Sequence, residues 1–288
     1  MRQEVDWCPG AFHKCPAVGS IPTPATNPLM QENPIGIIDS GVGGLSIAST
    51  LIKKLPNESF IYVADSKNCP YGQKTREEIY NLTKRMIDFL LSKEIKLLVI
   101  ACNSITVTCI DDLRKDYPTL PIVGIVPIIK TAVRKTKNKK IGIFSTVNTA
   151  KSKYQKDLIE KFAKDVFVLN QGSSKLVPLV EKLDFEAIDR ILEKELEPFR
   201  KKNIDTLALG CSHFPLIRKQ IQKYLPNVLI LDSSEAISRQ VERILNHEKL
   251  LSKSNLSYNF YTTGDLRALE YFALKLTNKA KTNKISLL

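Results

Sequence analysis

Short apolar runs alternate with amphipathic stretches along most of this chain. From Pro34 onward, runs of four or five apolar residues of strand type are followed, after a short join, by stretches with apolar positions at helical spacing. This alternation predicts a parallel sheet built from right-handed crossovers. The predicted strands are 35–39, 60–64, 97–101, 122–126, 141–145, 166–169, 206–209, 228–231 and 257–264, and the clearest helices are 74–91, 150–162, 185–201, 235–245 and 265–279.

Two stretches of the chain repeat one another. Residues 96–104 read Lys-Leu-Leu-Val-Ile-Ala-Cys-Asn-Ser, and residues 205–213 read Asp-Thr-Leu-Ala-Leu-Gly-Cys-Ser-His. Each apolar run is closed by a small residue, a cysteine and small polar residues before an amphipathic segment. Ligands in open α/β sheets collect at such strand ends, and a helix N-terminus favours a thiolate. We expect Cys102 and Cys211 to face each other across one site, although either thiol alone would be an ordinary core residue.

The repeat predicts two similar, doubly wound α/β domains with an active site in the cleft between them. We expect residues 34–130 with 240–288 to form the first domain and 131–239 the second, with the polar, basic segment 135–140 as the crossing. Residues 1–33 are rich in proline and lack periodicity, so we expect a disordered N-terminal extension. Met30, just before the first strand, is an alternative start, and no signal-peptide pattern precedes it.

Composition favours a cytoplasmic globular protein. The apolar fraction is 43%, and no apolar run approaches the ~18 residues of a membrane span. The formal charge of +13 arises from scattered lysine pairs, which favours a solvated surface over a nucleic-acid interface. Six cysteines are too few for a disulfide scaffold. Cys8, His13 and Cys15 lack a fourth ligand and zinc-type spacing, so we expect no metal site.

The segment Asp39-Ser40-Gly41-Val42-Gly43-Gly44 closes the first predicted strand. Its glycines would let backbone amides approach a bound anion at a helix N-terminus. A dinucleotide fingerprint would need a third glycine where Ser46 stands, and the charge of Asp39 would oppose a pyrophosphate. Asp39 suits a substrate ammonium or a proton relay with a thiol. An alternative is that Asp39 caps the helix in an ordinary tight turn.

Two further segments carry candidate chemistry. In the loop 65–72, Tyr71 and Gly72 could supply a hydroxyl and an amide to a carboxylate, while we interpret Cys69 as structural. His213, two residues after Cys211, could hold that cysteine as a thiolate. A Cys-His hydrolase is conceivable, but it would leave the other strand-end cysteine without a role.

The motifs 39–44, 70–72, 101–104 and 209–215, in this order, resemble those of glutamate racemase, in the cofactor-independent aspartate/glutamate racemase superfamily. The resemblance extends from Ile35 to about Asp265. It implies two similar α/β domains with the site between them, no cofactor, and interconversion of L- and D-glutamate to supply bacterial peptidoglycan synthesis. It also implies a homodimer, and a contact with gyrase by family analogy.

The resemblance assigns roles by position. Cys102 and Cys211 match the acid/base thiols, and Asp39 and His213 match the residues that assist them. The matching substrate contacts are Asp39, Ser40, Tyr71, Gly72, Asn103, Ser104, Ser212 and His213, and the accessory positions are Glu181, Thr146 and Thr149. The sequence departs from the family pattern at Ser104 and Ser212, where threonine is commoner, at Phe214, where tyrosine is commoner, and at Pro127, where many relatives carry an acidic residue.

The inventory suits racemisation, because this reaction removes the α-proton from one face and returns a proton to the other. A base and an acid of the same residue type suit a reaction that runs both ways, if one is a thiolate and the other a thiol. Aspartate racemase is the nearest alternative. A different class, a nucleic-acid or partner-binding protein that has kept the fold but lost turnover, is disfavoured by the intact cysteine pair.

Overall fold

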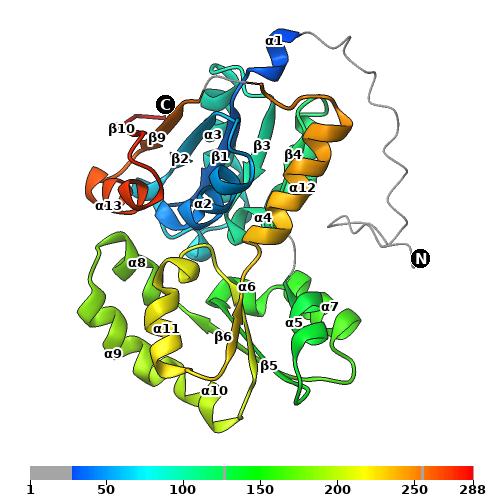
Figure 1. Cartoon of the computed structure of the whole chain (residues 1–288). Helices are drawn as coiled ribbons and strands as arrows, with labels where there is room; N and C mark the ends of the chain where they lie inside the picture. The colour runs from blue at the N-terminus through cyan, green and yellow to red at the C-terminus, as the bar shows by residue number, and fades with distance from the viewer. Residues whose placement is uncertain (1–27, 126–127, 254–255, 288) are drawn as a thin grey trace.

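The structure contains two parallel β-sheets, one above the other in Figure 1. It is a computed structural model that describes residues 28–125, 128–253 and 256–287. The first sheet, in the order β10-β9-β2-β1-β3-β4, consists of β1 (Ile35–Asp39), β2 (Phe60–Ala64), β3 (Leu97–Ile100), β4 (Ile122–Val123), β9 (Tyr258–Thr262) and β10 (Ala280–Lys284). The second, in the order β6-β5-β7-β8, consists of β5 (Lys140–Thr146), β6 (Phe167–Ser173), β7 (Thr206–Gly210) and β8 (Leu229–Leu231).

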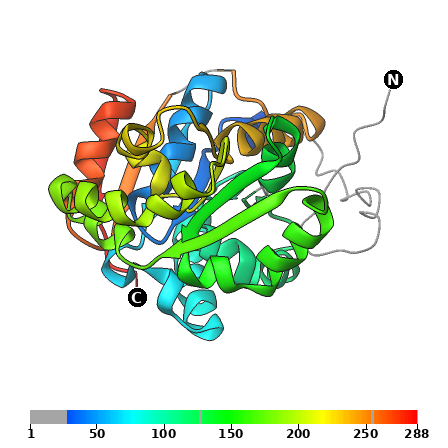
Figure 2. The same ribbon diagram turned by 90° about the horizontal axis from the view of Figure 1, so that it is seen from below.

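Helices pack against both sheets, and Figure 2 shows the molecule from below, with the second sheet nearer the viewer. With the first sheet lie α1 (Pro28–Gln31), α2 (Leu45–Lys54), α3 (Arg76–Leu91), α4 (Asn103–Asp116), α12 (Ser234–His247) and α13 (Leu266–Leu276). With the second lie α5 (Ile129–Lys135), α6 (Val147–Lys151), α7 (Lys153–Phe162), α8 (Leu176–Glu181), α9 (Phe185–Glu195), α10 (Glu197–Lys201) and α11 (Arg218–Tyr224). Short 3-10 turns are η1 (Val42–Gly44), η2 (Ser66–Asn68), η3 (Tyr71–Gln73) and η4 (Phe214–Ile217).

All strand pairs are parallel, which confirms the predicted α/β class. Every residue of β1, β2 and β3 is buried, because helices cover both faces of the sheet. This double burial is why these strands are continuous apolar runs. Each predicted strand has a counterpart, with boundaries that shift by a few residues.

Three elements differ from the sequence-based expectation. The strand β10 was not predicted, because its sequence Ala-Lys-Thr-Asn-Lys is polar and mostly exposed at the edge of the sheet. The helix expected at 150–162 divides at Ser152, whose side chain caps α7 by accepting a hydrogen bond from the Gln155 amide. The helix expected at 185–201 divides at Leu196, just before Pro198.

The expectation that the chain crosses between sheets at 135–140 is wrong. Ile129 and Ala132 of α5 pack with Ile141 and Leu158 of the second sheet and its helix, so the chain reaches this sheet before residue 135. It returns after β8, because α12 packs against α2 of the first sheet. The domain ranges 34–130 with 240–288 and 131–239 stay predictions.

Of the N-terminal extension, residues 28–33 belong to the described part of the chain. Residues 1–27, with Cys8, His13 and Cys15, lie outside the described residues. For 28–33 the expectation of disorder is wrong: α1 forms there, and the Lys96 ammonium donates to the Gln31 carbonyl at 2.5 Å. The Glu32 carboxylate also accepts from the Ser252 hydroxyl at 2.7 Å.

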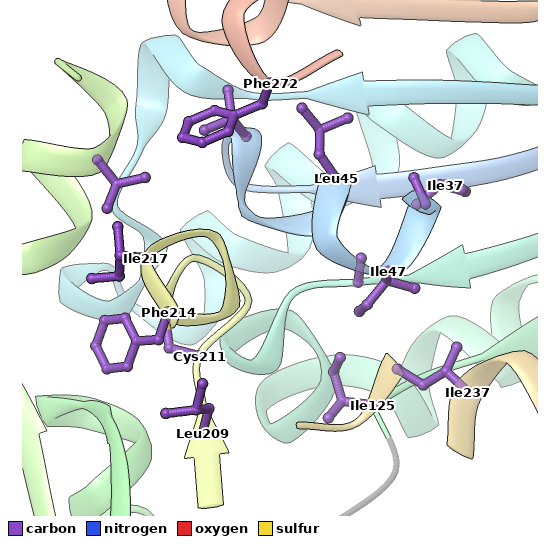
Figure 3. Close-up of a cluster of buried hydrophobic side chains, with 14 of the residues drawn as sticks. Ile37, Leu45, Ile47, Ile125, Leu209, Cys211, Phe214, Ile217, Ile237 and Phe272 are labelled. Atoms are coloured by element: carbon purple, nitrogen blue, oxygen red, sulfur yellow. The ribbon is translucent and has the colours of Figure 1, made fainter. Parts of the chain in front are cut away.

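The two units share one hydrophobic cluster (Figure 3). It contains Ile37 and Leu45 of the first unit together with Leu209, Phe214 and Ile217 of the second. The turn η4 carries Phe214 and Ile217 toward α2, so apolar burial holds the units together beside the strand ends. No helix within the described parts of the chain has the length and apolar character of a membrane span.

A buried ion pair anchors the opposite end of the first sheet. Lys96 and Glu58 lie 2.6 Å apart, with side chains 0% and 1% exposed. The Lys96 ammonium also donates to the carbonyls of Gln31 and Leu250, and Glu58 accepts from the Ser252 amide. This pair ties α1 and the segment after α12 to the sheet.

Replacing Lys96 by methionine leaves the Glu58 carboxylate buried without its cation. We expect Lys96→Met to lower the free energy of unfolding by about 3–5 kcal/mol, the usual cost of breaking a buried pair on one side. Urea unfolding followed by circular dichroism measures this. The control is Lys153→Met, which breaks the exposed Lys153–Asp157 pair and should leave the midpoint unchanged. Equal effects of the two changes would contradict the conclusion that the buried Lys96–Glu58 pair stabilises the fold.

Candidate active site

The carboxyl ends of the two sheets meet. The Val42 amide, after β1, donates to the Glu181 carboxylate of α8 at 2.7 Å. The Ser46 hydroxyl of α2 donates to the Ser212 carbonyl, after β7, at 3.3 Å. A Cβ placed on Gly72 would lie 3.2 Å from the Thr146 hydroxyl at the end of β5. Loops that leave the strands of one sheet therefore contact loops that leave the strands of the other.

Gly41 and Gly43 are required by this close approach. A Cβ on Gly41 would lie 2.1 Å from Glu181 Oε1, and one on Gly43 would lie 2.4 Å from His213 Nδ1 and 2.7 Å from its backbone nitrogen. We expected these glycines to admit a bound anion. In the structure the anion at the Val42 amide is the carboxylate of Glu181, so the glycines make room for the protein's own side chains.

Cys102 lies between β3 and α4, where it is the N-cap residue, and is 4% exposed. Because Ile38 pairs with Ile100, Ser40 lies beside Cys102, and the thiol donates to the Ser40 hydroxyl at 3.5 Å. Burial, with the negative charge of Asp39, raises the pKa of Cys102 to about 12. Burial therefore outweighs the stabilisation that the N-terminus of α4 offers to a thiolate at this position.

Asp39 is fully buried and follows Ser40 in the hydrogen bonds that start from this thiol. Its Oδ1 accepts from the Ser40 hydroxyl and from the Gly41 amide, each at 3.2 Å. Burial raises the pKa of Asp39, and the charge of His213 and a contact with Ser212 partly offset that rise. The N-cap of the following turn is Gly41, so the alternative interpretation of Asp39 as the N-cap is wrong. Cys102, Ser40 and Asp39 form a continuous hydrogen-bonded row.

On the other side of the site, His213 and Glu181 form a buried pair. Their Nε2 and Oε1 atoms are 2.7 Å apart, and the side chains are 2% and 15% exposed. Burial alone would lower the pKa of His213. Hydrogen bonds with Cys211 and Cys69 and the charge of Glu181 outweigh it and raise the pKa well above 6.5. The raised pKa favours the imidazolium form of His213, which lies next to Cys211, itself 5% exposed.

The remaining predicted residues border these two groups. The Tyr71 hydroxyl donates to the Asp65 carboxylate at 2.6 Å, so it is already engaged. Thr146 caps α6 and its hydroxyl donates to that of Thr149 at 2.9 Å. Asn103 and Ser104 form the first turn of α4, directly after the N-cap cysteine. Pro127, the departure from the family pattern, lies outside the described residues.

Two neighbours of the site were missed from the sequence. Cys69, interpreted as structural, lies against His213 and Glu181, and burial raises its pKa to about 11. Tyr62 donates its hydroxyl to the Gly41 carbonyl at 2.5 Å. No sequence pattern marked Tyr62, which lies in the apolar strand β2. For Cys69, a thiol in a loop at a strand end was the available signal.

Comparison with known proteins decides the family. The model of the Asp/Glu/Hydantoin racemase family matches residues 35–241. This chain belongs to that family. It is 38% identical over 251 residues to the glutamate racemase of Lactobacillus acidophilus, covering 85% of this chain and 93% of the relative. The resemblance found from the motifs is thus confirmed, and the protein is an amino-acid racemase.

Two solved glutamate racemases from this family are similar in structure. The Escherichia coli enzyme, in complex with L-glutamate and the activator UDP-MurNAc-ala, has a TM-score of 0.79 and 30% identity, and the match covers 89% of this chain and 99% of that one. The Francisella tularensis enzyme, in complex with D-glutamate, has a TM-score of 0.76 and 30% identity, with 89% and 98% covered. The similarity extends over both sheets.

Ionisation of Cys102 links stability to pH. Above pH ~8.5 the unfolded chain loses this thiol proton, whereas the folded chain keeps it up to about pH 12. The unfolded state then binds fewer protons, so the free energy of unfolding falls by about 1.4 kcal/mol per pH unit between those values. We expect Cys102→Ser, which carries no ionisable thiol, to flatten that slope by the same amount in urea unfolding at several pH values. An unchanged slope would contradict the burial argument.

The carboxylate of Glu181 supports the charge on His213. We expect Glu181→Gln, which keeps the size and an acceptor for the Val42 amide, to lower the pKa of His213. Titration of the imidazole resonances by NMR measures this. The matched control is Glu248→Gln beside the exposed His247, which should leave the His213 titration as it is. An unchanged His213 pKa in Glu181→Gln would contradict the conclusion that Glu181 supports the charge on His213.

Proposed function

We propose that this protein is a cofactor-independent glutamate racemase that interconverts L- and D-glutamate, with Cys102 and Cys211 as its two acid/base thiols. The similarity to curated glutamate racemases over most of the chain supports the activity. Related enzymes have been solved with L-glutamate and with D-glutamate. In this family the enzyme supplies D-glutamate for peptidoglycan synthesis.

The observation that carries the proposal is the placement of the two cysteines. Cys102 follows β3 and Cys211 follows β7, interior strands of the two sheets, and both thiols are buried where the strand-end loops meet. Racemisation needs an acid and a base on opposite sides of the α-carbon. Thiols supplied by opposing sheets fulfil that requirement for both directions of the reaction.

The surroundings of each thiol suggest how its proton moves. The row from Cys102 through Ser40 to Asp39 is a route by which the buried carboxylate takes the thiol proton and leaves a thiolate. Asp39 suits this task because its raised pKa lies closer to that of the thiol. Near Cys211, the His213 ring, whose pKa is raised, can donate a proton to the thiol sulfur or accept one from it. By family analogy, Cys102 serves D-glutamate and Cys211 serves L-glutamate.

We propose that the strand-end loops move apart to admit glutamate. The loops are closely packed here, since no Cβ fits at Gly41 or Gly43 beside Glu181 and His213. We propose that Asn103, Ser104, Ser212 and the amide of Gly72 then donate to the substrate carboxylates. The positive end of α4 adds to the attraction. Tyr71, engaged by Asp65, would orient this loop, and Thr146 and Thr149 line the opposite side.

Assembly and location rest on the resemblance alone. We propose a cytoplasmic homodimer, because both properties are common among the relatives that this chain resembles. A contact with gyrase is also proposed, and it too is supported by the family resemblance alone. The scattered distribution of lysines along the sequence continues to favour a protein that does not bind nucleic acid.

The proposal is tested by following the loss of chirality. Purified protein is incubated with L-glutamate, D-glutamate or L-aspartate, without added cofactor, and the ellipticity is recorded. We expect decay with both glutamate enantiomers and none with L-aspartate. Cys102→Ala and Cys211→Ala should each lower the rate by about 10²–10⁴-fold, the usual contribution of a positioned acid or base.

The control for these variants is Cys109→Ala. Cys109 is a buried thiol of α4 whose sulfur donates to the Ile105 carbonyl, so its loss should leave the rate within a few-fold. Solvent deuterium should enter the α-position of the product at the rate of racemisation. A signal that stays flat for glutamate, or variants as active as the wild type, would overturn the two-thiol proposal.

A further inference from the structure

Cys69, Glu181 and His213 form a cluster of three different metal-ligand types. Each offers one ligand atom, and the three atoms lie within 4.8 Å of one another. Thiolate, carboxylate and imidazole are the donors that zinc takes in proteins, and sites with three protein ligands leave a fourth position open. The proposed function assigns roles to Glu181 and His213, but it assigns none to the third member, Cys69.

The spacing of the three atoms fits one small cation after a minor adjustment. Zinc bonds of about 2.0–2.3 Å in tetrahedral geometry place ligand atoms roughly 3.2–3.8 Å apart. Glu181 Oε1 and His213 Nε2 are now 2.7 Å apart around a shared proton. A cation in place of that proton would move these atoms apart by several tenths of an ångström. The sulfur of Cys69 lies within 4.8 Å of both atoms.

The surroundings support the ligands. The Val42 amide donates to the Glu181 carboxylate and fixes its position, as outer-shell groups do in metal sites. The buried carboxylate of Asp39 interacts electrostatically with His213 and adds negative potential. Binding of a divalent cation would release the proton of the Cys69 thiol and that of the His213 imidazolium, which leaves a neutral complex of cation, thiolate, carboxylate and imidazole.

We propose that Cys69, Glu181 and His213 form a binding site for a thiophilic divalent cation, best matched by zinc, and that occupancy inhibits the enzyme. The inhibition rests on the proposed function, because it arises from the capture of His213 and Glu181. The binding itself does not. Magnesium and calcium are excluded as occupants, because these hard cations take oxygen ligands and bind thiolates poorly.

Binding is tested on the purified, metal-free full chain with zinc by calorimetry and with cobalt(II) as the spectroscopic probe. We expect one cobalt ion per chain, with a thiolate-to-cobalt charge-transfer band and the visible bands of a tetrahedral site. Cys69→Ser should abolish the charge-transfer band and weaken zinc binding at least tenfold. The matched control, Cys109→Ser, should keep both. A band that is absent in the wild type, or that persists in Cys69→Ser, overturns the site.

Inhibition is tested by comparing each variant with its own metal-free rate on L-glutamate. Zinc should inhibit the wild type and Cys109→Ser, and EDTA should restore activity, whereas Cys69→Ser should need at least tenfold more zinc. A cobalt band in a protein without racemase activity would refute the proposed function and leave the cation site standing. An active racemase without the band, or one inhibited equally with and without Cys69, would refute the cation proposal alone.

Discussion

The carboxylate of Glu181 joins the two halves of the site. One oxygen accepts from the Val42 amide of the first unit and from the His213 ring of the second, both at 2.7 Å. Its charge helps to keep the buried imidazole protonated against the desolvation that would discharge it. The position of the first loop, the charge beside Cys211 and the closed arrangement of the strand ends all depend on this one group.

The same contact determines which residues the loops can contain. Gly41 and Gly43 leave space for Glu181 and His213, so a side chain at either position would displace the second unit. The closed packing also removes water from the thiols, and desolvation is the largest cause of the raised pKa of Cys102. Close packing thus favours the uncharged thiol form of Cys102, while Glu181 and His213 of the second unit form an ion pair.

Much of this arrangement could be predicted from the sequence. Strands covered on both faces, such as β1 and β3, are continuous apolar runs, and the repeat around Cys102 and Cys211 predicted two equivalent strand ends. The polar edge strand β10 could not be found, because it buries too little surface to show a pattern. The position of Cys69 beside Glu181 and His213 also escaped prediction, because it follows from contacts between units that are distant in sequence. The raised pKa of Cys102 escaped prediction because it follows from burial and the charge of Asp39.

The strand order has a consequence for biosynthesis. The strands of the second sheet, β5 to β8, follow one another in the sequence without a strand of the first sheet between them. In contrast, β9 pairs with β2 but follows β2 by almost two hundred residues. During translation the second unit can therefore fold before the first is complete, and one backbone edge of β2 stays unpaired in that interval. An open parallel edge is prone to aberrant pairing, so the nascent chain is most exposed to aggregation in the interval before Tyr258–Thr262 leaves the ribosome.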